Sequence, residues 1–314
     1  MNRRPRGGKL LTRSMMHMAA RLHYLDGHSQ VEVAERMEVS TATVSRLLSL
    51  ARDEGIVRIQ VSDPDEADNL GEDLAARLGL KAVRVVESDR AAAVSIHLAS
   101  LLKEARLPRR PVLALGWGRM VQAVIATGLP PLPGGTVIPV IGGMDETAAH
   151  FQINEFVRLA AEQMGAGARF LHAPSTVSAE LRAVLDRDPG VAALTGLWDR
   201  ADVALLGIGQ FPAVSGHAAP RFAPEDVGRV VGDVARHYFD FEGRQILWQG
   251  QQGQMSISAE QLRRVPMSIG LATGRDKACA ILGAARSGLI NMLVTDIRAA
   301  QDMADLLEAP SRSY

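Results

Sequence analysis

The feature that most constrains this chain is an alternation, from about residue 80 onward, of short β-branched runs with stretches of helical periodicity. Strands separated by helices form a mostly parallel sheet that helices cover on both faces. The sequence therefore predicts a Rossmann-like, mostly parallel α/β domain over residues 63–314. The expected strands are Val83–Val86, Val112–Leu115, Thr136–Val140, Arg169–Leu171, Val203–Gly207, Met267–Ala272 and Met292–Thr295. The expected helices are Ala91–Arg106, Arg119–Thr127, Phe151–Met164, Ser178–Arg187, Arg275–Ser287 and Ile297–Glu308.

Residues 1–62 follow a different pattern, in which apolar residues recur at helical spacing without strands between them. Three helices are expected here, and Gly27 ends the first of them. Two short helices joined by a tight turn form the element that places its second helix in the DNA major groove. We therefore expect a helix-turn-helix domain over residues 1–62. Its expected helices are Leu10–Asp26, Gln30–Met37 and Ala42–Glu54.

The third of these helices has polar side chains near its amino end, because Val44, Leu47 and Leu48 form its inner face. Arginine can read guanine with two hydrogen bonds, and hydroxyl groups reach bases or phosphates. Capping or plain surface exposure is the alternative for each Ser or Thr taken singly. A short strand over Ile56–Ser62 would follow as a wing. The candidate DNA-binding residues are Ser40, Thr41, Thr43, Ser45, Arg46 and Arg58.

The distribution of charge agrees with this interpretation. The whole chain has 35 basic and 35 acidic residues, yet residues 1–62 hold ten Lys/Arg against six Asp/Glu, which makes their net charge +4. The net charge of residues 63–314 is therefore −4. A basic head on a mildly acidic body indicates a polyanionic partner for the head.

Several other functions are excluded by what the sequence lacks. A single cysteine, Cys279, excludes an intramolecular disulfide or a Cys-rich zinc site, and the eight histidines show no metal-ligand spacing. No GxSxG or GxxxxGK[ST] motif is present, so we expect no metal and no cofactor. The uncharged residues 120–144 contain four prolines, which a membrane-spanning helix would not tolerate. With no visible signal peptide, a cytoplasmic protein without a membrane partner is expected.

Glycines follow several of the expected strands, where ligands of parallel sheets bind. A glycine turn before a helix lets backbone N–H groups hold an anion. Lys277 is expected in the first turn of a helix, where its charge opposes the helix dipole unless an anion is bound. A solvated or salt-bridged lysine is the alternative. The turn residues are Gly116, Gly118, Gly142, Gly143, Gly207, Gly209, Thr273 and Gly274.

Over about residues 11–308 the chain resembles the SorC/DeoR group of bacterial sugar-responsive transcriptional regulators. The segments that carry this resemblance are SQVEVAERMEVSTATVSRLLSLARDEGIVRI, LGWGRM, VIPVIGG, LLGIG, VGDVARHYFDFEG and GLATGRDKACAILGAARSGLINMLVTD. The resemblance implies a helix-turn-helix followed by a sensor domain of the glucosamine-phosphate deaminase/ribose-phosphate isomerase type. It also implies three partners: operator DNA, a sugar, sugar-phosphate or polyol effector, and further copies of the chain in a tetramer or dimer.

The resemblance further implies an effector site. Asp240 lies in this implied site, although a turn or capping role is the default for such a residue at an element end. Arg119 and Met120 stand where the family commonly has Ser or Thr after its second glycine. Arg119 could form a charge-assisted pair with a phosphate, or the effector could instead be a free sugar or polyol. The implied phosphate contacts are Gly116, Trp117, Gly118, Arg119, Met120, Thr273, Gly274 and Lys277, and the implied sugar contacts are Gly142, Gly143 and Asp240.

An enzyme is the second hypothesis, namely a sugar-phosphate isomerase or deaminase with an accessory DNA-binding head. Likeness of fold does not by itself carry catalysis. The sequence shows no convincing paired acid and base near the glycine turns, and a DNA-reading head is hard to explain in an enzyme. We therefore expect a regulator of a carbohydrate catabolic operon rather than an enzyme.

Overall fold

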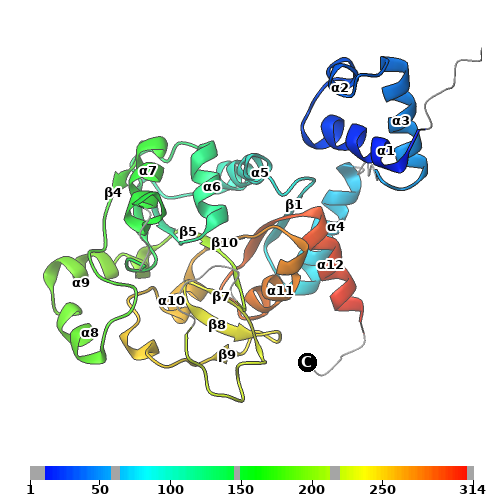
Figure 1. The fold of residues 1–314 in the computed structure, drawn as a ribbon. Coiled ribbons are helices and arrows are strands. Elements are labelled where there is room, and N and C mark those ends of the chain that lie inside the picture. The colour runs from blue at the N-terminus through cyan, green and yellow to red at the C-terminus, as the bar shows by residue number, and fades with distance from the viewer. Residues whose placement is uncertain (1–10, 58–63, 145–148, 213–219, 310–314) are drawn as a thin grey trace, which may run out of the picture. The chain divides into compact units, whose positions relative to one another are not determined.

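The computed structural model describes residues 11–57, 64–144, 149–212 and 220–309. The chain divides into two compact units, Met1–Ser62 and Asp63–Tyr314 (Figure 1). The described part of the first unit is helical, whereas the second combines helices with two β-sheets.

The first unit packs three α-helices around a small apolar core. Gly27 adopts a positive φ of 74° before the second helix, which is the role predicted for it. Residues 37–40 form the turn between the second and third helices, and Ser40 caps the third by accepting a hydrogen bond from the Thr43 N–H. Side chains of Val33, Val44 and Leu47 are fully buried between the helices. The elements are α1 (Arg13–Ala20), the π-helical turn η1 (Arg21–Leu25), α2 (Gln30–Arg36) and α3 (Thr41–Asp53).

The second unit is built on a seven-stranded sheet in which every pair of neighbouring strands is parallel. The α/β fold predicted from the alternation of strands and helices is therefore confirmed. In spatial order the strands are β1 (Ala82–Val86), β11 (Met292–Asp296), β10 (Met267–Leu271), β5 (Val203–Gly207), β2 (Val112–Leu115), β3 (Thr136–Pro139) and β4 (Gly167–Ala168).

Helices cover both faces of this sheet (Figure 1). The strands are consequently buried on both sides. For this reason β2 and β10 are almost entirely apolar and do not alternate between apolar and polar residues. Helices α5 (Ala91–Glu104), α6 (Arg119–Thr127) and α7 (Ile153–Met164) pack together on one face. Helices α4 (Pro64–Leu78), α11 (Ala278–Arg286) and α12 (Ile297–Glu308) pack together on the other.

A second, antiparallel sheet packs through β7 and β8 against α11. It was not predicted, because its strands are short and β7, β8 and β9 follow one another through turns instead of helices. Tyr238 of β8 belongs to a cluster of four aromatic rings with Phe211, Phe222 and Trp248, which lie between or after the other strands of this sheet. The strands are β6 (Gly209–Gln210), β7 (Val230–Val234), β8 (His237–Asp240) and β9 (Gln245–Ile246).

Two predictions of local structure need comment. The expected strand Arg169–Leu171 is wrong, because pairing with β3 ends at Ala168 and only the Arg169 N–H continues it, to the Val137 carbonyl. The expected wing falls outside the described residues except for Ile56 and Val57, which lie in a bend. The remaining elements are α8 (Ala179–Leu185), α9 (Pro189–Thr195), α10 (Ala259–Arg264), η2 (Ala149–Phe151), η3 (Trp198–Arg200), η4 (Gln251–Gly253) and η5 (Arg275–Lys277).

Candidate functional site

Three glycine turns meet at the carboxyl edge of the parallel sheet, because β2, β5 and β10 are neighbours. The turns after β2 and β5 touch: a Cβ on Gly207 would lie 2.9 Å from the Trp117 carbonyl oxygen. Gly118 precedes the first turn of α6, whose backbone N–H groups have no partner within the helix. This arrangement presents backbone donors and the positive end of a helix at the edge of the sheet.

Lys277 reaches the same place from the turn after β10. Its ammonium Nζ donates a hydrogen bond of 2.9 Å to the carbonyl oxygen of Ile208, in the loop after β5. Burial lowers the pKa of Lys277, while the carboxylates of Asp233 and Asp276 act in the opposite direction. The Arg119 guanidinium is close enough to lower the pKa of Lys277 further. Two cations and a helix amino terminus therefore converge on one site.

The turn that carries Lys277 is held in a fixed shape. Gly274 has a φ of 105°, which residues with a side chain rarely adopt, and its N–H donates to the Asp296 carboxylate. The second oxygen of Asp296 accepts the N–H groups of Arg298 and Ala299 and so caps α12. Asp296 therefore fixes the turn and the following helix together. Thr273, directly before this glycine, is half-buried at the same edge.

Asp233, on β7, belongs to this site although the sequence analysis did not select it. Its carboxylate lies against Gly209, where a Cβ would collide with it, and its Oδ2 accepts the Arg236 N–H at 3.0 Å. Burial raises the pKa of Asp233, while Arg236 and Lys277 oppose that shift. The signal that could have found it is the alternation Val-Gly-Asp-Val, which places one carboxylate within an otherwise apolar strand.

Two residues of the first glycine turn have structural contacts. The Trp117 indole Nε1–H donates to the Phe151 carbonyl at 2.7 Å, and its ring packs edge-on against Phe151. Met120 packs against the core of the α/β unit. These contacts hold the turn in place, and they leave Arg119 as its exposed, charged side chain.

Gly142 and Gly143 lie beyond the end of β3, one strand further from Lys277 than the turn after β2. Their N–H groups already donate to the carbonyl oxygens of Met255 and Ala173. A Cβ on Gly142 would meet two carbonyl oxygens of the segment 173–174 at 2.5 and 2.6 Å. The glycines thus permit a close approach of chain segments at this position.

Asp240 is not brought together with the three glycine turns. It packs beside Gly283, in the second half of α11, whereas Lys277 directly precedes the first turn of that helix. Burial alone would raise the pKa of Asp240. However, the Arg244 N–H and the guanidinium groups of Arg229 and Arg244 hold it below its ordinary value. The turn role is the one that its contacts support.

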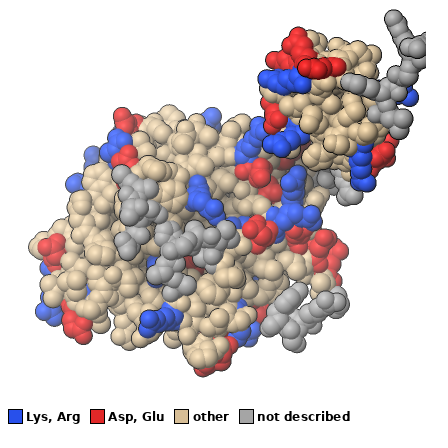
Figure 2. Space-filling view, viewed as in Figure 1, with Lys and Arg blue, Asp and Glu red and all other residues tan. Residues whose placement is uncertain are grey.

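In the first unit, α3 presents polar side chains at its amino end. Thr41, Ser45 and Arg46 are exposed, whereas Thr43 is half-buried and its hydroxyl lies 2.8 Å from the capping hydroxyl of Ser40. Arg58 lies outside the described residues. Figure 2 shows acidic and basic side chains interspersed over the visible face of each unit. On this visible face the charges of the described residues form no broad basic patch (Figure 2).

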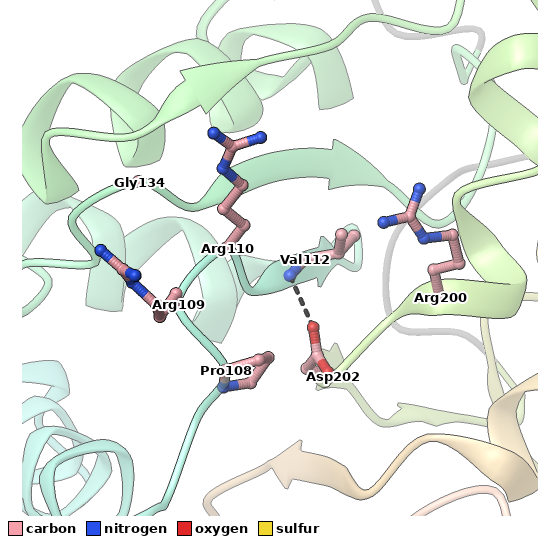
Figure 3. A pocket seen from close by; sticks show the side chains of 7 residues that line it. All are labelled: Pro108, Arg109, Arg110, Val112, Gly134, Arg200 and Asp202. Atoms are coloured by element: carbon pink, nitrogen blue, oxygen red, sulfur yellow. Dashed lines mark hydrogen bonds between the residues drawn. The ribbon is translucent and has the colours of Figure 1, made fainter.

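A separate cavity of about 850 Å³ lies at the opposite, amino edge of the sheet. It is bordered by the starts of β2 and β5, where the Asp202 carboxylate accepts the Val112 N–H at 2.8 Å (Figure 3). Arg109, Arg110 and Arg200 line it. None of the predicted effector residues borders this cavity. Within the described residues, no three His, Cys, Asp or Glu side chains are grouped so that they could hold a metal ion, and no helix there is long and apolar enough to cross a membrane.

Comparison with known proteins identifies the family. A family model of a sugar-binding domain, Sugar-bind, matches residues 62–304. The sorbitol operon regulator of Klebsiella pneumoniae is 29% identical over 301 residues, which cover 90% of this chain and 95% of that protein. The chain belongs to the SorC family of sugar-binding transcriptional regulators. The family predicted from the sequence motifs is confirmed.

Further relatives agree with this assignment. A deoxyribonucleoside regulator of Bacillus subtilis is 27% identical over 304 residues, or 91% of this chain and 96% of the relative. The crystal structure of the full-length SorC regulator from Klebsiella pneumoniae superposes with a TM-score of 0.70 at 26% identity, covering 95% of this chain and 99% of that one. The likeness therefore extends over both units of this SorC-family chain, and its assignment as a sugar-responsive transcriptional regulator is confirmed.

The raised pKa of Asp233 leads to a prediction about stability and pH. Burial disfavours the ionised carboxylate of Asp233. Its ionisation therefore lowers the free energy of unfolding as the pH rises above 3.8, the ordinary pKa of the group. Asp233→Asn should therefore raise the melting temperature at pH 7, and the gain should shrink toward zero near pH 4. Thermal unfolding of both proteins from pH 4 to pH 8, without added sugar, measures this. A less stable variant at pH 7 would mean that pairing with Lys277 outweighs burial.

Proposed function

We propose that this SorC-family protein binds operator DNA through α3 and changes its operator affinity when a sugar phosphate binds at the carboxyl edge of the parallel sheet. The observation that carries the proposal is the convergence of Lys277, Arg119 and the amino end of α6 at one site. A phosphate group suits this site, since charge-assisted and backbone hydrogen bonds both favour an anion there.

The DNA-binding part of the proposal is supported by the geometry of the first unit. A helix-turn-helix reads DNA with the amino-terminal residues of its second helix. Helix α3 has Arg46 exposed in its second turn, with Thr41 and Ser45 exposed beside it. We propose that Arg46 reads a base, while Ser40 acts mainly as the cap of α3.

The sugar-binding part is supported by the mixed character of the site. Arg119 and Lys277 supply positive charge, whereas the Asp233 carboxylate accepts hydrogen bonds. A ligand with an anionic end and hydroxyl groups matches both, because hydroxyls donate to carboxylates. The names of the relatives, which refer to sorbitol and deoxyribonucleosides, are consistent with ligands that carry hydroxyl groups. A free sugar or polyol remains the alternative, in which Arg119 would have no phosphate to bind.

Regulation further requires that the protein act as an oligomer. Helix-turn-helix modules bind paired half-sites about one helical turn apart, or a multiple of it, and symmetric oligomers supply the matching pair of recognition helices. We propose a dimer or tetramer that acts in the cytoplasm, where operator DNA is found.

Catalysis is not part of the proposal. Asp233 and Lys277 do form a neighbouring acid and base, which the sequence alone had not revealed. An acid and a base can bind a ligand without reacting with it, and here the Lys277 ammonium donates to the Ile208 carbonyl while the Asp233 carboxylate accepts the Arg236 N–H. Relatives over nearly the full chain are transcriptional regulators, and we propose that this protein is likewise not an enzyme.

The proposed base contact of Arg46 can be tested directly. Arg46→Ala should weaken binding to the cognate operator by about 1–3 kcal/mol, because a bidentate contact to a base is lost. Thr41→Ala is the matched control and should have a smaller effect. Fluorescence anisotropy with operator and random duplexes measures both. An equal loss of affinity for the two duplexes would assign Arg46 to a phosphate and contradict base reading.

The role of Lys277 can be tested through the response to effector. Lys277→Met keeps the aliphatic stem and should leave operator affinity close to that of the wild type. A ligand shifts the binding equilibrium only through differential affinity for two states, so loss of the anion contact should abolish the response. Operator affinity is measured with and without the sugar phosphate that stabilises the wild type most. A variant that still responds at the wild-type concentration would exclude Lys277 as a ligand.

Arg119 distinguishes a phosphorylated from a neutral effector. Arg119→Ala should weaken a sugar phosphate by about 1.5–3 kcal/mol, the range for hydrogen bonds to charged groups, and leave the corresponding free sugar almost unaffected. Calorimetric titration with sorbitol and sorbitol 6-phosphate compares the two. Equal affinity of the variant and wild type for both compounds would show that Arg119 does not contact the effector.

A further inference from the structure

The turn between β7 and β8 adopts an unfavourable backbone conformation. Ala235 and Arg236 form a two-residue hairpin loop between the paired residues Val234 and His237, with φ values of 50° and 63°. Hairpin loops of this kind favour Asn-Gly, because residues with a Cβ are disfavoured at positive φ. Neither Ala nor Arg relieves that strain. Such strain persists at sites where the surrounding structure requires it, often for function.

The Arg236 side chain is held in place by Trp248. Its guanidinium carbon lies 4.6 Å from the centre of the Trp248 ring, a cation–π contact. The Arg236 Nε is nonetheless buried without a hydrogen-bond partner among the described residues, and the Trp248 indole Nε1 likewise has none. Trp248 is 8% exposed. Two buried N–H donors are thus left unused side by side.

Acceptors without partners lie in neighbouring segments. The Thr176 Oγ1, Gln251 Oε1 and Gln254 Oε1 atoms are buried with no hydrogen-bond partner in the described part of the chain. Thr176 pairs with Gln254 in an isolated β-bridge, and the Gln254 Nε2 donates to the Ala235 carbonyl at 2.9 Å. We name Thr176, Arg236, Trp248, Gln251 and Gln254 the Arg236 cluster.

The chemistry of the Arg236 cluster points to hydroxyl groups. Buried polar groups are normally paired, so several unused ones in one place call for a ligand or ordered water. A hydroxyl both donates and accepts, and it can therefore satisfy N–H donors and amide oxygens together. A fully ionised phosphate group only accepts and would meet the amide oxygens unfavourably. We name Arg119, Lys277 and the amino end of α6 the anion site. The Arg236 cluster thus favours hydroxyl groups, whereas the anion site favours a phosphate.

Asp233 connects the two places. Its Oδ2 accepts the Arg236 N–H, while its negative charge acts to raise the pKa of Lys277 at the anion site. We propose that Arg236 and Trp248 form a hydroxyl-recognition subsite, which binds the end of the sugar or polyol chain remote from the phosphate. This inference rests on the proposed function, because it assumes that the effector phosphate lies at Lys277.

The experiment uses the full-length protein and three probes, of which two carry a hydroxyl chain and one does not. Sorbitol 6-phosphate and ribose 5-phosphate carry hydroxyl chains, whereas inorganic phosphate can occupy only the anion site. Arg236→Gly and Trp248→Phe each remove one unused donor, and the second keeps an aromatic ring under the same turn. Ala235→Gly is the matched control, since it relieves backbone strain in the same loop without removing a side chain that could bind. Lys277→Met reports on the anion site.

We expect Arg236→Gly and Trp248→Phe to weaken the tighter-binding sugar phosphate about tenfold, the effect of one lost hydrogen bond. Affinity for inorganic phosphate should be unchanged in both, and Ala235→Gly should match the wild type for every probe. Lys277→Met should weaken all three probes. A merely structural role of Arg236 would lower the melting temperature instead and leave the affinities alone.

Three results would overturn the subsite. Wild-type affinity of both variants for both sugar phosphates would exclude contact with the ligand. Equal weakening of inorganic phosphate would show that the cluster acts on the anion site or the fold. Failure of all probes to bind the wild type would overturn the proposed function and the subsite together. Loss of sugar-phosphate binding in Arg236→Gly, with full binding in Lys277→Met, would support the subsite and contradict only the anion site.

Discussion

The structure depends on one constraint, which is that β2, β5 and β10 are neighbours in a parallel sheet and therefore end at the same edge. This order brings together turns that are far apart in the chain. Gly207 permits the turns after β2 and β5 to touch, and the Lys277 ammonium joins the third turn to the second through the Ile208 carbonyl. The proposed anion contacts depend on this adjacency, because Arg119 and Lys277 are far apart in the sequence and only the strand order brings them together.

Periodicity explains how much of the fold could be predicted. The strands of the parallel sheet are continuous apolar runs separated by helices, so β2 and α6 were predicted with their observed limits. The antiparallel sheet has no comparable signal, because β6 and β9 have two residues each and the five residues of β7 include Gly232 and Asp233. The segment 169–171 has a composition that suits a strand, but it lies just beyond Ala168, the last residue of β4 that pairs with β3.

The site was predicted only in part, for a different reason. Lys277 and the glycine turns are local features, since each follows an apolar run directly in the sequence. Asp233 becomes part of the site only when β7 pairs with β6, which sets its carboxylate against Gly209. The sequence offers two aspartates in the same segment, and nothing local says which faces the glycine turns. Asp240 was selected, yet its carboxylate is bound by Arg229 and Arg244.

The position of Asp233 also limits which ligands fit the proposed site. A site made only of Arg119, Lys277 and helix N–H groups would hold any small anion. A partly desolvated carboxylate beside them repels anions and is itself costly to keep ionised, as its raised pKa indicates. A ligand that brings hydroxyl donors to the carboxylate and a phosphate to the cations removes both penalties at once. If the proposed site is correct, its pairing of unlike charges should therefore make it select sugar phosphates over inorganic phosphate.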